Sequence, residues 1–283
     1  MRVTKVAAHT IIINSTQQYA DINSHCLKTF FPKIIPMCSE WRHYNRERFL
    51  NALERKGVRV HIIRHALILE ELTRLRRRNT RRFEFRQALR RMGELLTYEL
   101  LREAKVEKTQ IKTPLGKARG FKLKDSFVVV PVLRAGLPIA EGFNAMIKSV
   151  EIAFVSCWRE KDLSVKVEYA KVPQIEGKHV IIIDPMLATG HSLCAVYEAL
   201  KPYGKAKSWK ILAVIASPAG LREISKTFPK GTDVFICALD DEVMEKGFIG
   251  PGLNASGYIV PGLGDAGDRA YGKPVKHLPW KLA

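Results

Sequence analysis

The apolar positions of the chain fall into short runs that are separated by stretches of mixed polarity. The run from Val180 to Ile183 holds four consecutive β-branched residues, which is typical of a strand covered on both faces, as in a parallel sheet. Similar runs predict strands at residues 126–133, 151–157, 210–216 and 233–238. Stretches with helical patterns follow these runs. The chain therefore predicts an α/β fold with a doubly wound, mostly parallel sheet and right-handed crossovers.

Further elements are predicted around this sheet. Residues 65–78 and 82–105 each carry an apolar stripe at helical spacing. Residues 111–114 are predicted to be a short extended piece, and residues 115–124 a basic turn interrupted by glycines. Charged and apolar side chains alternate over residues 159–173, as in an exposed β-hairpin. The expected fold thus adds N-terminal helices and a β-hairpin flap to the sheet.

The strand at residues 179–183 leads into a loop that has the physical features of a phosphate site. Pro185 ends the strand because it cannot donate to the ladder, and it holds Asp184 extended. Residues 189–192 then offer backbone N–H groups and hydroxyls where a helix is expected to begin. The loop has no lysine, which excludes the common lysine-containing nucleotide loop and favours a sugar monophosphate. The alternative is a helix-capping loop that binds nothing.

Two other segments place polar residues next to predicted turns. The strand at residues 126–133 ends in Arg134, and Pro138 is suited to the start of the next helix. Ligands of open α/β sheets lie beyond the carboxyl ends of the strands, so Arg134 is a candidate ligand contact.

The second segment, residues 257–272, is rich in glycine. Its glycines and Pro261 argue against a helix or a regular strand and allow the backbone to approach a ligand closely. Asp265 and Asp268 add two carboxylates. Residues 247–254 echo residues 257–264, as in a partial duplication of ten residues, and we expect the second copy to be the functional one. By pattern alone, the segment is an elaborate turn.

Three strings in this chain resemble one known family. The first string, VIIIDPMLATGHS (residues 180–192), closely resembles the loop that binds 5-phospho-α-D-ribose 1-diphosphate (PRPP) in type I phosphoribosyltransferases. Within that family, its sequence resembles the uracil phosphoribosyltransferase branch. VLRAGL (residues 132–137) resembles the pyrophosphate-side loop of that family. The segment GYIVPGLGDAGDRAYG (residues 257–272) matches its uracil-binding loop almost letter for letter. The resemblance covers about residues 58–272.

This resemblance implies a uracil phosphoribosyltransferase of pyrimidine salvage, which converts uracil and PRPP to UMP and diphosphate. It implies catalytic roles for Asp184, Arg134 and Asp265. The implied PRPP contacts are Arg134, Arg159, Asp184, Pro185, Met186, Leu187, Ala188, Thr189, Gly190, His191, Ser192 and Asp265. The implied uracil contacts are Ile259, Gly264, Asp265 and Ala266. Mg²⁺ is implied as an ion that binds with PRPP, without a metal site made by the protein alone. GTP activation and a homo-oligomer, either dimer or tetramer, are also implied.

The charge of the chain leaves other interpretations open. The formal net charge is +19, and nine arginines fall between Arg74 and Arg91 with Glu84 as the only acid among them. Such a cluster can follow a nucleic-acid backbone, bind an anionic effector, or form a solvated helix face. One alternative function is therefore an RNA-binding regulator of a pyrimidine operon built on the same fold. Another is a phosphoribosyltransferase for a different base. The intact substrate loops favour the enzyme for uracil, so we expect no nucleic-acid partner.

The remaining composition bears on compartment and boundaries. Five scattered cysteines without C-x-x-C spacing indicate a reduced, cytoplasmic setting, and no apolar run is long enough to span a membrane. Residues 1–57, with a short helix at 41–53, are expected to be an N-terminal extension that is poorly ordered or not native. In the latter case Val58 is the native start. A transit peptide is the alternative, because the stretch contains few acids and many hydroxyl residues. Residues 58–283 are expected to form the phosphoribosyltransferase domain, which begins with a short strand at 58–63.

Overall fold

A computed structural model describes residues 39–159, 165–240, 252–254 and 257–273 of the chain. The chain forms two compact units, residues 1–49 with 243–249 and residues 50–242 with 250–283. Of the first unit, the described part is the beginning of α4 (Ser39–Arg55), which confirms the helix expected at residues 41–53. The expectations for residues 1–38 lie outside the described part. Everything that follows concerns the second unit.

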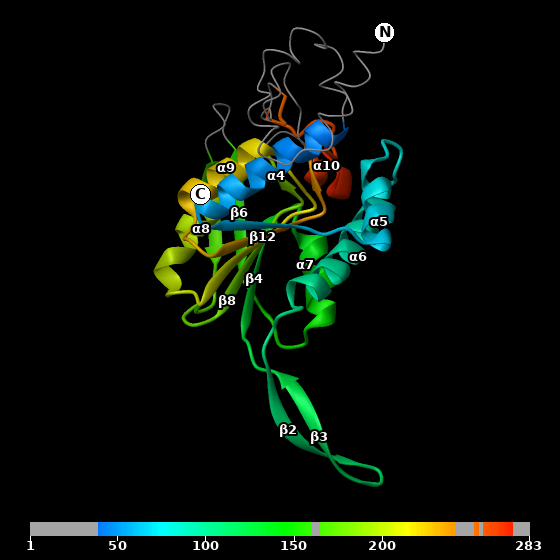
Figure 1. Ribbon diagram of the computed structural model, residues 1–283, viewed down its shortest axis with the longest axis vertical. Coiled ribbons are helices and arrows are strands. Elements are labelled where there is room, and N and C mark those ends of the chain that lie inside the picture. Colours follow the sequence, from blue (N-terminus) through cyan, green and yellow to red (C-terminus); the bar gives the residue numbers. More distant parts are fainter. Residues whose placement is uncertain (1–38, 160–164, 241–251, 255–256, 274–283) are drawn as a thin grey trace, which may run out of the picture. The chain divides into compact units, whose positions relative to one another are not determined.

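An eight-stranded sheet is the centre of this unit (Figure 1). Its strands are parallel except for the pair β6–β7, which confirms the mostly parallel sheet. Seven strands follow one another in the order β1 (Val58–Ile62), β12 (Thr232–Ile236), β10 (Ser208–Leu212), β8 (His179–Ile183), β4 (Phe127–Leu133), β6 (Phe154–Arg159) and β7 (Val165–Lys171), and β5 (Glu151–Ile152) pairs with β4. The expected strand at 151–157 is therefore two strands. β5 pairs with residues 128–129 of β4, β6 pairs with residues 132–133 of the same strand, and Ala153 lies between β5 and β6.

Strand β8 lies between two parallel neighbours, as its apolar sequence predicts. Ile181 pairs with Lys210 of β10 on one side and with Val129 of β4 on the other. All four residues from Val180 to Ile183 are fully buried. Burial on both faces explains why the strand is continuously apolar instead of alternating.

Helices cover both faces of the sheet (Figure 1). Residues 129, 181 and 183 share a core with helices on one side, and residues 128, 180 and 182 face the other. The helices of the first side are α5 (Ala66–Arg76), α6 (Arg82–Leu100) and α7 (Leu137–Met146), and those of the second are α8 (His191–Leu200) and α9 (Pro218–Thr227). A short 3₁₀ helix, η2 (Lys201–Tyr203), follows α8. The N-terminal helices are confirmed, but α6 ends at Leu100 instead of continuing to residue 105.

A second, smaller parallel sheet extends the first beyond its carboxyl edge. It consists of β13 (Ala238–Leu239), β11 (Ile215–Ala216) and β9 (Met186–Leu187) in that order. The predictions of single strands at 210–216 and 233–238 were wrong in this respect. Between β10 and β11 the chain changes partner, because the N–H groups of Val214 and Ile215 both donate to the carbonyl of Pro185. The loop after β8 is thereby built into a rigid ladder.

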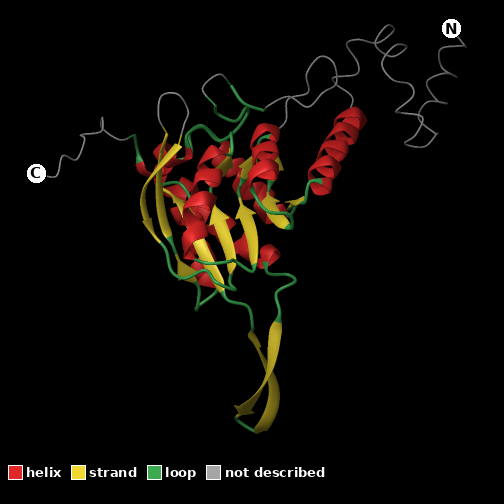
Figure 2. Ribbon diagram, turned by 90° about the vertical axis from the view of Figure 1, so that its left-hand side faces the viewer, coloured by secondary structure: helices red, strands yellow, loops and turns green. Residues whose placement is uncertain are grey.

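The unit contains two antiparallel hairpins, one at the edge of the main sheet and one outside it. The β6–β7 pair confirms a hairpin in the predicted region, but it spans residues 154–171 instead of 159–173, and residues 160–164 lie outside the described part. Strands β2 (Val106–Thr113) and β3 (Gly116–Leu123) pair along their full length and project from the unit (Figure 2). The prediction of a basic turn at 115–124 was wrong, because Thr113 and Gly116 form the turn and the lysine-rich residues beyond them continue as a strand.

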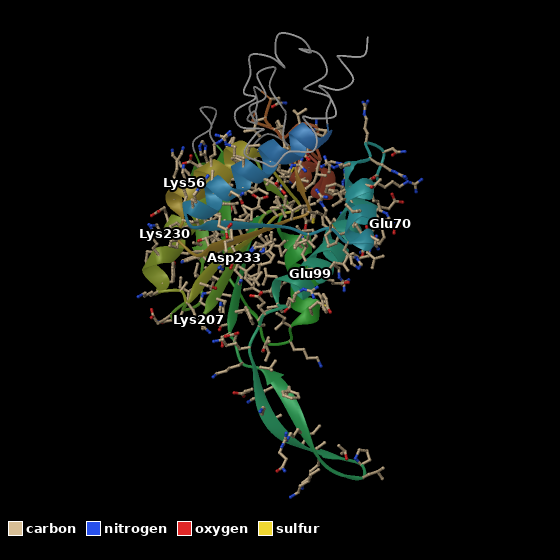
Figure 3. All side chains as sticks on the ribbon, viewed as in Figure 1. Lys56, Glu70, Glu99, Lys207, Lys230 and Asp233 are labelled. Atoms are coloured by element: carbon tan, nitrogen blue, oxygen red, sulfur yellow. The ribbon has the colours of Figure 1, made fainter. Side chains whose placement is uncertain are left out.

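A buried acid joins three strands on one face of the main sheet. Asp233 of β12, labelled in Figure 3, is only 6% exposed. It accepts a bidentate pair of hydrogen bonds from Arg59 of β1 at 2.8 and 3.0 Å, and one from Lys210 of β10 at 3.2 Å. Nε2 of His61 lies 2.9 Å from the same carboxylate. Burial alone would raise the pKa of Asp233, but the hydrogen bonds from His61 and Arg59 and the charge of Lys210 hold it well below its ordinary value. No helix in the described part is long and apolar enough to cross a membrane.

Candidate active site

Two of the three predicted loops follow adjacent strands at the same edge of the sheet. Asp184 follows β8 and Arg134 follows β4, and these strands pair in parallel register from Phe127–His179 to Pro131–Ile183. A side chain at Gly136 would collide with the carbonyl oxygen of Ile183, so the loop after β4 lies directly against the end of β8. The parallel register therefore brings the two loops together, as expected from the strand ends.

The phosphate loop, residues 184–192, is held by its own backbone and by α9. Oδ1 of Asp184 accepts a hydrogen bond from the N–H of Met186 at 3.1 Å, which fixes the turn out of β8. Ser217 caps α9 by accepting from the N–H of Gly220, and its hydroxyl donates to the carbonyl of Ala188 at 2.6 Å. The beginning and the middle of the loop are thus supported by the protein itself.

Gly190 forms the junction between the phosphate loop and α8. Its φ of 86° lies in the left-handed region that favours glycine. A side chain there would meet Cβ of Glu223 at 3.0 Å and the carbonyl of Gly220 at 3.1 Å. The turn directs the first N–H groups of α8, which begins at His191, toward the loop, where the helix dipole favours an anion.

Individual residues of the phosphate loop differ in what they can offer a ligand. Pro185, Leu187 and Ala188 are buried, so a contact from them would come from the backbone. The carbonyl groups of Pro185 and Leu187 already accept hydrogen bonds from β11 and Ser217. Thr189, Ser192 and the exposed His191 remain the side chains that can face a bound phosphate.

Arg134 connects the loop after β4 to the glycine-rich segment. The peptide bond between Leu133 and Arg134 is cis. Nη2 of Arg134 donates to Oδ1 of Asp268 at 3.0 Å, and Nη1 donates to the carbonyl of Gly272 at 3.1 Å. The guanidinium remains half-exposed and thus accessible to an anionic ligand.

The glycine-rich segment, residues 257–272, contains a helix that the sequence analysis had argued against. Helix α10 (Ala266–Tyr271) begins after the positive-φ residues Gly262 and Gly264 have made the turn. Oδ1 of Asp265 caps it by accepting from the N–H of Asp268 at 2.8 Å. The argument from glycine content failed because most of the glycines lie outside the helix and because a side-chain cap offsets the unfavourable propensity.

The residues expected to contact a base are arranged around this cap. Ile259 and Ala266 are buried, whereas Gly264 and Asp265 are exposed. Oδ2 of Asp265 lies 3.5 Å from the hydroxyl of Tyr258. Of the echoed upstream copy, residues 247–251 lie outside the described part. Its last residues pair with the second copy through an antiparallel bridge between Leu253 and Ile259.

The position of Arg159 is given only by its backbone. It ends β6 and pairs with Val165 of β7, the last pair before residues 160–164 of the hairpin predicted to lie over the ligand. Its side chain lies outside the described part, so its expected contact with PRPP stays a prediction.

The thiol of Cys157 is close enough to Asp184 for the carboxylate charge to shift its pKa. Burial, and then the negative charge of Asp184, raise the pKa of the Cys157 thiol to about 12. Cys157 therefore stays protonated and neutral near neutral pH. Among the described residues, no three His, Cys, Asp or Glu side chains gather into a metal-binding group.

Three residues that hold the glycine-rich segment were not predicted from the sequence. Arg76 of α5 and the buried Asp240 after β13 pair with each other and with the backbone of Gly262. Arg269 of α10 donates to the carbonyl groups of Leu263, Leu75 and Arg77. The position of Asp240 directly after a strand was a usable signal, but its partners are distant in sequence.

The arginine cluster is accordingly divided between structural and solvated positions. Several of its members bind within the unit: Arg74 with Glu70, Arg76 with Asp240, Arg86 with the carbonyl of Ala270, Arg90 with Glu94, and Arg91 with Glu71. Arg77, Arg78 and Arg81 are exposed at the turn between α5 and α6. The expectation that the chain has no nucleic-acid partner stays a prediction.

Comparisons with known proteins agree with one another. The family model described as uracil phosphoribosyltransferase matches residues 62–257. A uracil phosphoribosyltransferase of Thermococcus sibiricus is 39% identical over 214 residues, which cover 74% of this chain and 88% of that protein. One of Methanococcus vannielii is 40% identical with the same coverage. The solved structure of a protein from Aquifex aeolicus matches with a TM-score of 0.67 and 34% identity, over 75% of this chain and 98% of that one.

Proposed function

The chain belongs to the uracil phosphoribosyltransferase family of type I phosphoribosyltransferases, and from this premise we propose that it converts uracil and PRPP to UMP and diphosphate. In this pentosyl transfer, the bond from ribose C1 to the diphosphate oxygen breaks and a bond from C1 to N1 of uracil forms. Diphosphate leaves with its electron pair, and the N1 proton of uracil is released. The reaction serves pyrimidine salvage.

The observation that carries this proposal is the meeting of three loops at one edge of the sheet. The phosphate loop and Arg134 follow adjacent strands, and Arg134 is bonded to Asp268 of the glycine-rich segment. Because the transfer proceeds by bringing a sugar phosphate and a base together, positioning should provide much of the rate. An arrangement in which separate loops hold the phosphate, the diphosphate and the base meets this requirement.

The phosphate end of PRPP is assigned to residues 184–192. Backbone N–H groups and hydroxyls between Ala188 and Ser192 bind the 5′-phosphate at the amino end of α8. Asp184 is assigned to the ribose hydroxyls, from which its carboxylate would accept hydrogen bonds, while its Oδ1 also holds the N–H of Met186. This end of the substrate does not react, so its contacts serve to fix C1 in place.

The reacting end is assigned to Arg134, Arg159 and Asp265. Negative charge develops on the leaving diphosphate, and fixed guanidinium groups stabilise it in the transition state. Positive charge develops on the sugar at C1, where the Asp265 carboxylate provides the opposite charge. No side chain is assigned as a general base for the uracil N1 proton.

Uracil is assigned to the backbone of Ile259 and of residues 264–266. Uracil presents an N3–H donor between two carbonyl acceptors, and peptide groups in an open glycine-rich turn can match this order. Cytosine reverses the order at two positions and would leave buried groups unpaired, which can cost about 10⁴-fold or more in specificity. Base selection is therefore proposed to reside in residues 259–266.

Magnesium is proposed to bind together with PRPP. The chemistry of the donor set fits this role, because the carboxylates of Asp184 and Asp265 are hard oxygen donors of the kind that Mg²⁺ accepts. Mg²⁺ keeps several waters and readily takes its remaining ligands from phosphate oxygens. When bound, it would neutralise charge on the diphosphate, and Asp265 is the residue that we assign to contact it.

Four further properties are proposed by analogy with the family. They are activation by GTP, assembly into a dimer or tetramer, a cytoplasmic location, and a catalytic domain formed by residues 58–283. Assays of UMP formation with and without GTP, and measurement of the mass in solution, test the first two. An unchanged rate of UMP formation in the presence of GTP would contradict activation by GTP.

A panel of substrates distinguishes the proposal from its alternatives. The purified protein is incubated with PRPP, Mg²⁺ and each of uracil, cytosine, hypoxanthine, guanine and adenine, and the nucleotide products are separated. We expect UMP alone. A purine nucleotide as the main product would assign the protein to another base. Salt-sensitive RNA binding without any nucleotide product would assign it to RNA regulation.

A further inference from the structure

A buried acid outside the predicted site binds the backbone of the glycine-rich segment. Asp240 follows β13 and is 6% exposed. Its Oδ2 accepts a hydrogen bond from the N–H of Gly262 at 2.9 Å. Arg76, in the last turn of α5, binds both oxygens of the same carboxylate, at 2.8 Å and 2.5 Å. The charge of Asp240 is therefore balanced by Arg76, and the same carboxylate also accepts a hydrogen bond from the glycine-rich segment.

Arg76 also reaches the other side of the same glycine. Its Nη1 donates to the carbonyl oxygen of Gly262 at 3.1 Å. The N–H and the C=O of Gly262 are thus both held, one by the acid and one by the arginine. We call these three residues, Arg76, Asp240 and Gly262, the loop clamp.

The loop clamp acts at the tightest point of the segment. Gly262 has a φ of 62°, and a side chain there would collide with the carbonyl oxygen of Ile259. The carbonyl group of Ile259 therefore lies directly against Gly262. Two residues later, Gly264 begins the stretch proposed to contact uracil. A displacement at Gly262 would pass directly to both parts of the base site.

A second arginine supports the same turn from α10. Arg269 donates to the carbonyl of Leu263 at 2.8 Å and to that of Arg77 at 2.5 Å, and it also binds the carbonyl of Leu75. Its guanidinium lies over the ring of Phe85, 4.3 Å from the ring centroid. Burial lowers the pKa of Arg269. The end of α5 and the glycine-rich segment are thus joined by two arginines at successive residues, Gly262 and Leu263.

A comparable ion pair elsewhere in the unit lacks this connection. Arg91 of α6 binds both oxygens of Glu71 of α5, at 2.7 and 3.1 Å, and Glu71 is 7% exposed. This pair joins two helices and has no bond to the glycine-rich segment. It is likewise a forked arginine–carboxylate pair with a buried acid, although Arg74 also lies 3.6 Å from Glu71. It is therefore a control for the structural value of such a pair.

We propose that Arg76 and Asp240 are positioning residues for the base: by holding Gly262 from both sides, they fix the backbone groups of residues 259–266 that select uracil. The inference rests on the proposed assignment of uracil to this segment. Neither residue is among those assigned to the substrates. Arg76 is therefore not one of the solvated arginines of the cluster, and its proposed role in the reaction is indirect.

The test compares Asp240→Asn and Arg76→Lys with the control Glu71→Gln. In steady-state assays we expect Asp240→Asn to raise the KM for uracil about 10- to 100-fold, because a buried charge-assisted bond is lost. The KM for PRPP should change by less than about threefold, since the phosphate loop is supported by Ser217 instead. Arg76→Lys keeps the charge but not the forked geometry, so we expect a smaller rise in the same direction. Glu71→Gln should lower stability without changing the uracil KM.

Amide hydrogen exchange provides a readout that does not depend on turnover. In the wild type, the Gly262 N–H should be protected, and Asp240→Asn should speed its exchange at least about tenfold while the amides of β8 keep their protection. A general loss of structure would instead speed exchange in β8 as well. Unchanged exchange at Gly262, equal rises in both KM values, or an equal uracil effect in Glu71→Gln would overturn the inference.

The two experiments separate this inference from the proposed function. If the wild type forms no UMP, the proposed function fails, while the exchange of Gly262 still reports whether the clamp fixes the turn. If the wild type forms UMP and the variants keep a normal uracil KM, the function stands and the positioning role fails.

Discussion

Arg134 and Asp268 lie 134 positions apart in sequence and are joined by a hydrogen bond of 3.0 Å from Nη2 to Oδ1. Arg134 also donates to the carbonyl of Gly272 at 3.1 Å. The arginine proposed to bind the diphosphate is therefore oriented by the helix that follows the proposed base loop. This contact links the two substrate subsites through a side chain that stays half-exposed and available to an anion.

Replacing Arg134 should damage the reaction without damaging the fold. In Arg134→Ala the transition state loses a fixed positive charge, and kcat/KM for PRPP should fall by roughly 100- to 1,000-fold. Arg134→Lys should recover only a small part, because an ammonium cannot hold Asp268, Gly272 and the diphosphate together. Steady-state kinetics with a thermal-unfolding control measure both effects. A loss that scales with the unfolded fraction would indicate a structural role instead.

Asp184→Asn should abolish most activity while the phosphate loop keeps its shape. The asparagine oxygen can still accept from the N–H of Met186, so the turn after β8 is preserved. The negative charge that accepts the ribose hydroxyl protons is lost, which should lower kcat/KM by about 100-fold or more. Near-normal turnover in both Asp184→Asn and Arg134→Ala would contradict the assignment of the site.

Gly190→Ala tests whether the junction between the phosphate loop and α8 requires glycine. An alanine would be strained at φ 86° and would crowd Cβ of Glu223. We expect the free energy of unfolding to fall by more than about 1 kcal/mol and the KM for PRPP to rise. Gly231→Ala is the matched control, because Gly231 has a φ of 89° with open space where a side chain would lie. Equal effects of both changes on the KM for PRPP would argue against a phosphate site at Gly190.

The stability of the unit should fall as the pH drops below about 6.5, owing to His179. Burial lowers the pKa of His179, and Lys207 and Lys210 act in the same direction, although Asp125 opposes them. The unfolded chain then binds more protons than the folded one at mildly acidic pH, so acid favours unfolding. Urea unfolding across this range, repeated with His179→Gln, measures the effect. The variant should show a flatter profile, and an unchanged slope would contradict the assignment.

A second loss of stability is expected at lower pH, owing to Asp233. Its folded-state pKa lies below the ordinary value of about 4, so its contribution is present above that pH and is lost as the pH falls further. Asp233→Asn should lower the free energy of unfolding near neutral pH by about 1–3 kcal/mol, because Arg59 and Lys210 lose a buried charged partner. It should also remove much of the loss below about pH 4. A variant as stable as the wild type near neutral pH would show that the cluster adds nothing.

Elements that depend on local pattern were predictable from the sequence. The β-branched run from Val180 to Ile183 needs both faces covered, and it forms the central strand β8. Pro138 marks the first turn of α7, and the loop with the sequence of the phosphate site lies at the amino end of α8. These features follow from neighbours within about ten residues along the chain.

Features that depend on distant partners were not predictable in the same way. Nothing near Asp240 in sequence indicates that it binds Arg76, which lies 164 positions earlier. The split of residues 210–216 into two strands follows from the carbonyl of Pro185, which belongs to another loop. Helix α10 was missed because glycine content was weighed without the cap that Asp265 provides. In each case the decisive contact is a side chain or carbonyl brought in by the fold.

The measurement that tests the central claim most directly is the formation of UMP by the purified protein from uracil and PRPP with Mg²⁺. The account predicts that UMP and diphosphate appear in equal amounts and that both substrates are required. It further predicts that Arg134→Ala and Asp184→Asn, folded by the same criteria as the wild type, lose most of this activity. A folded wild-type protein that forms no UMP under these conditions would contradict the account.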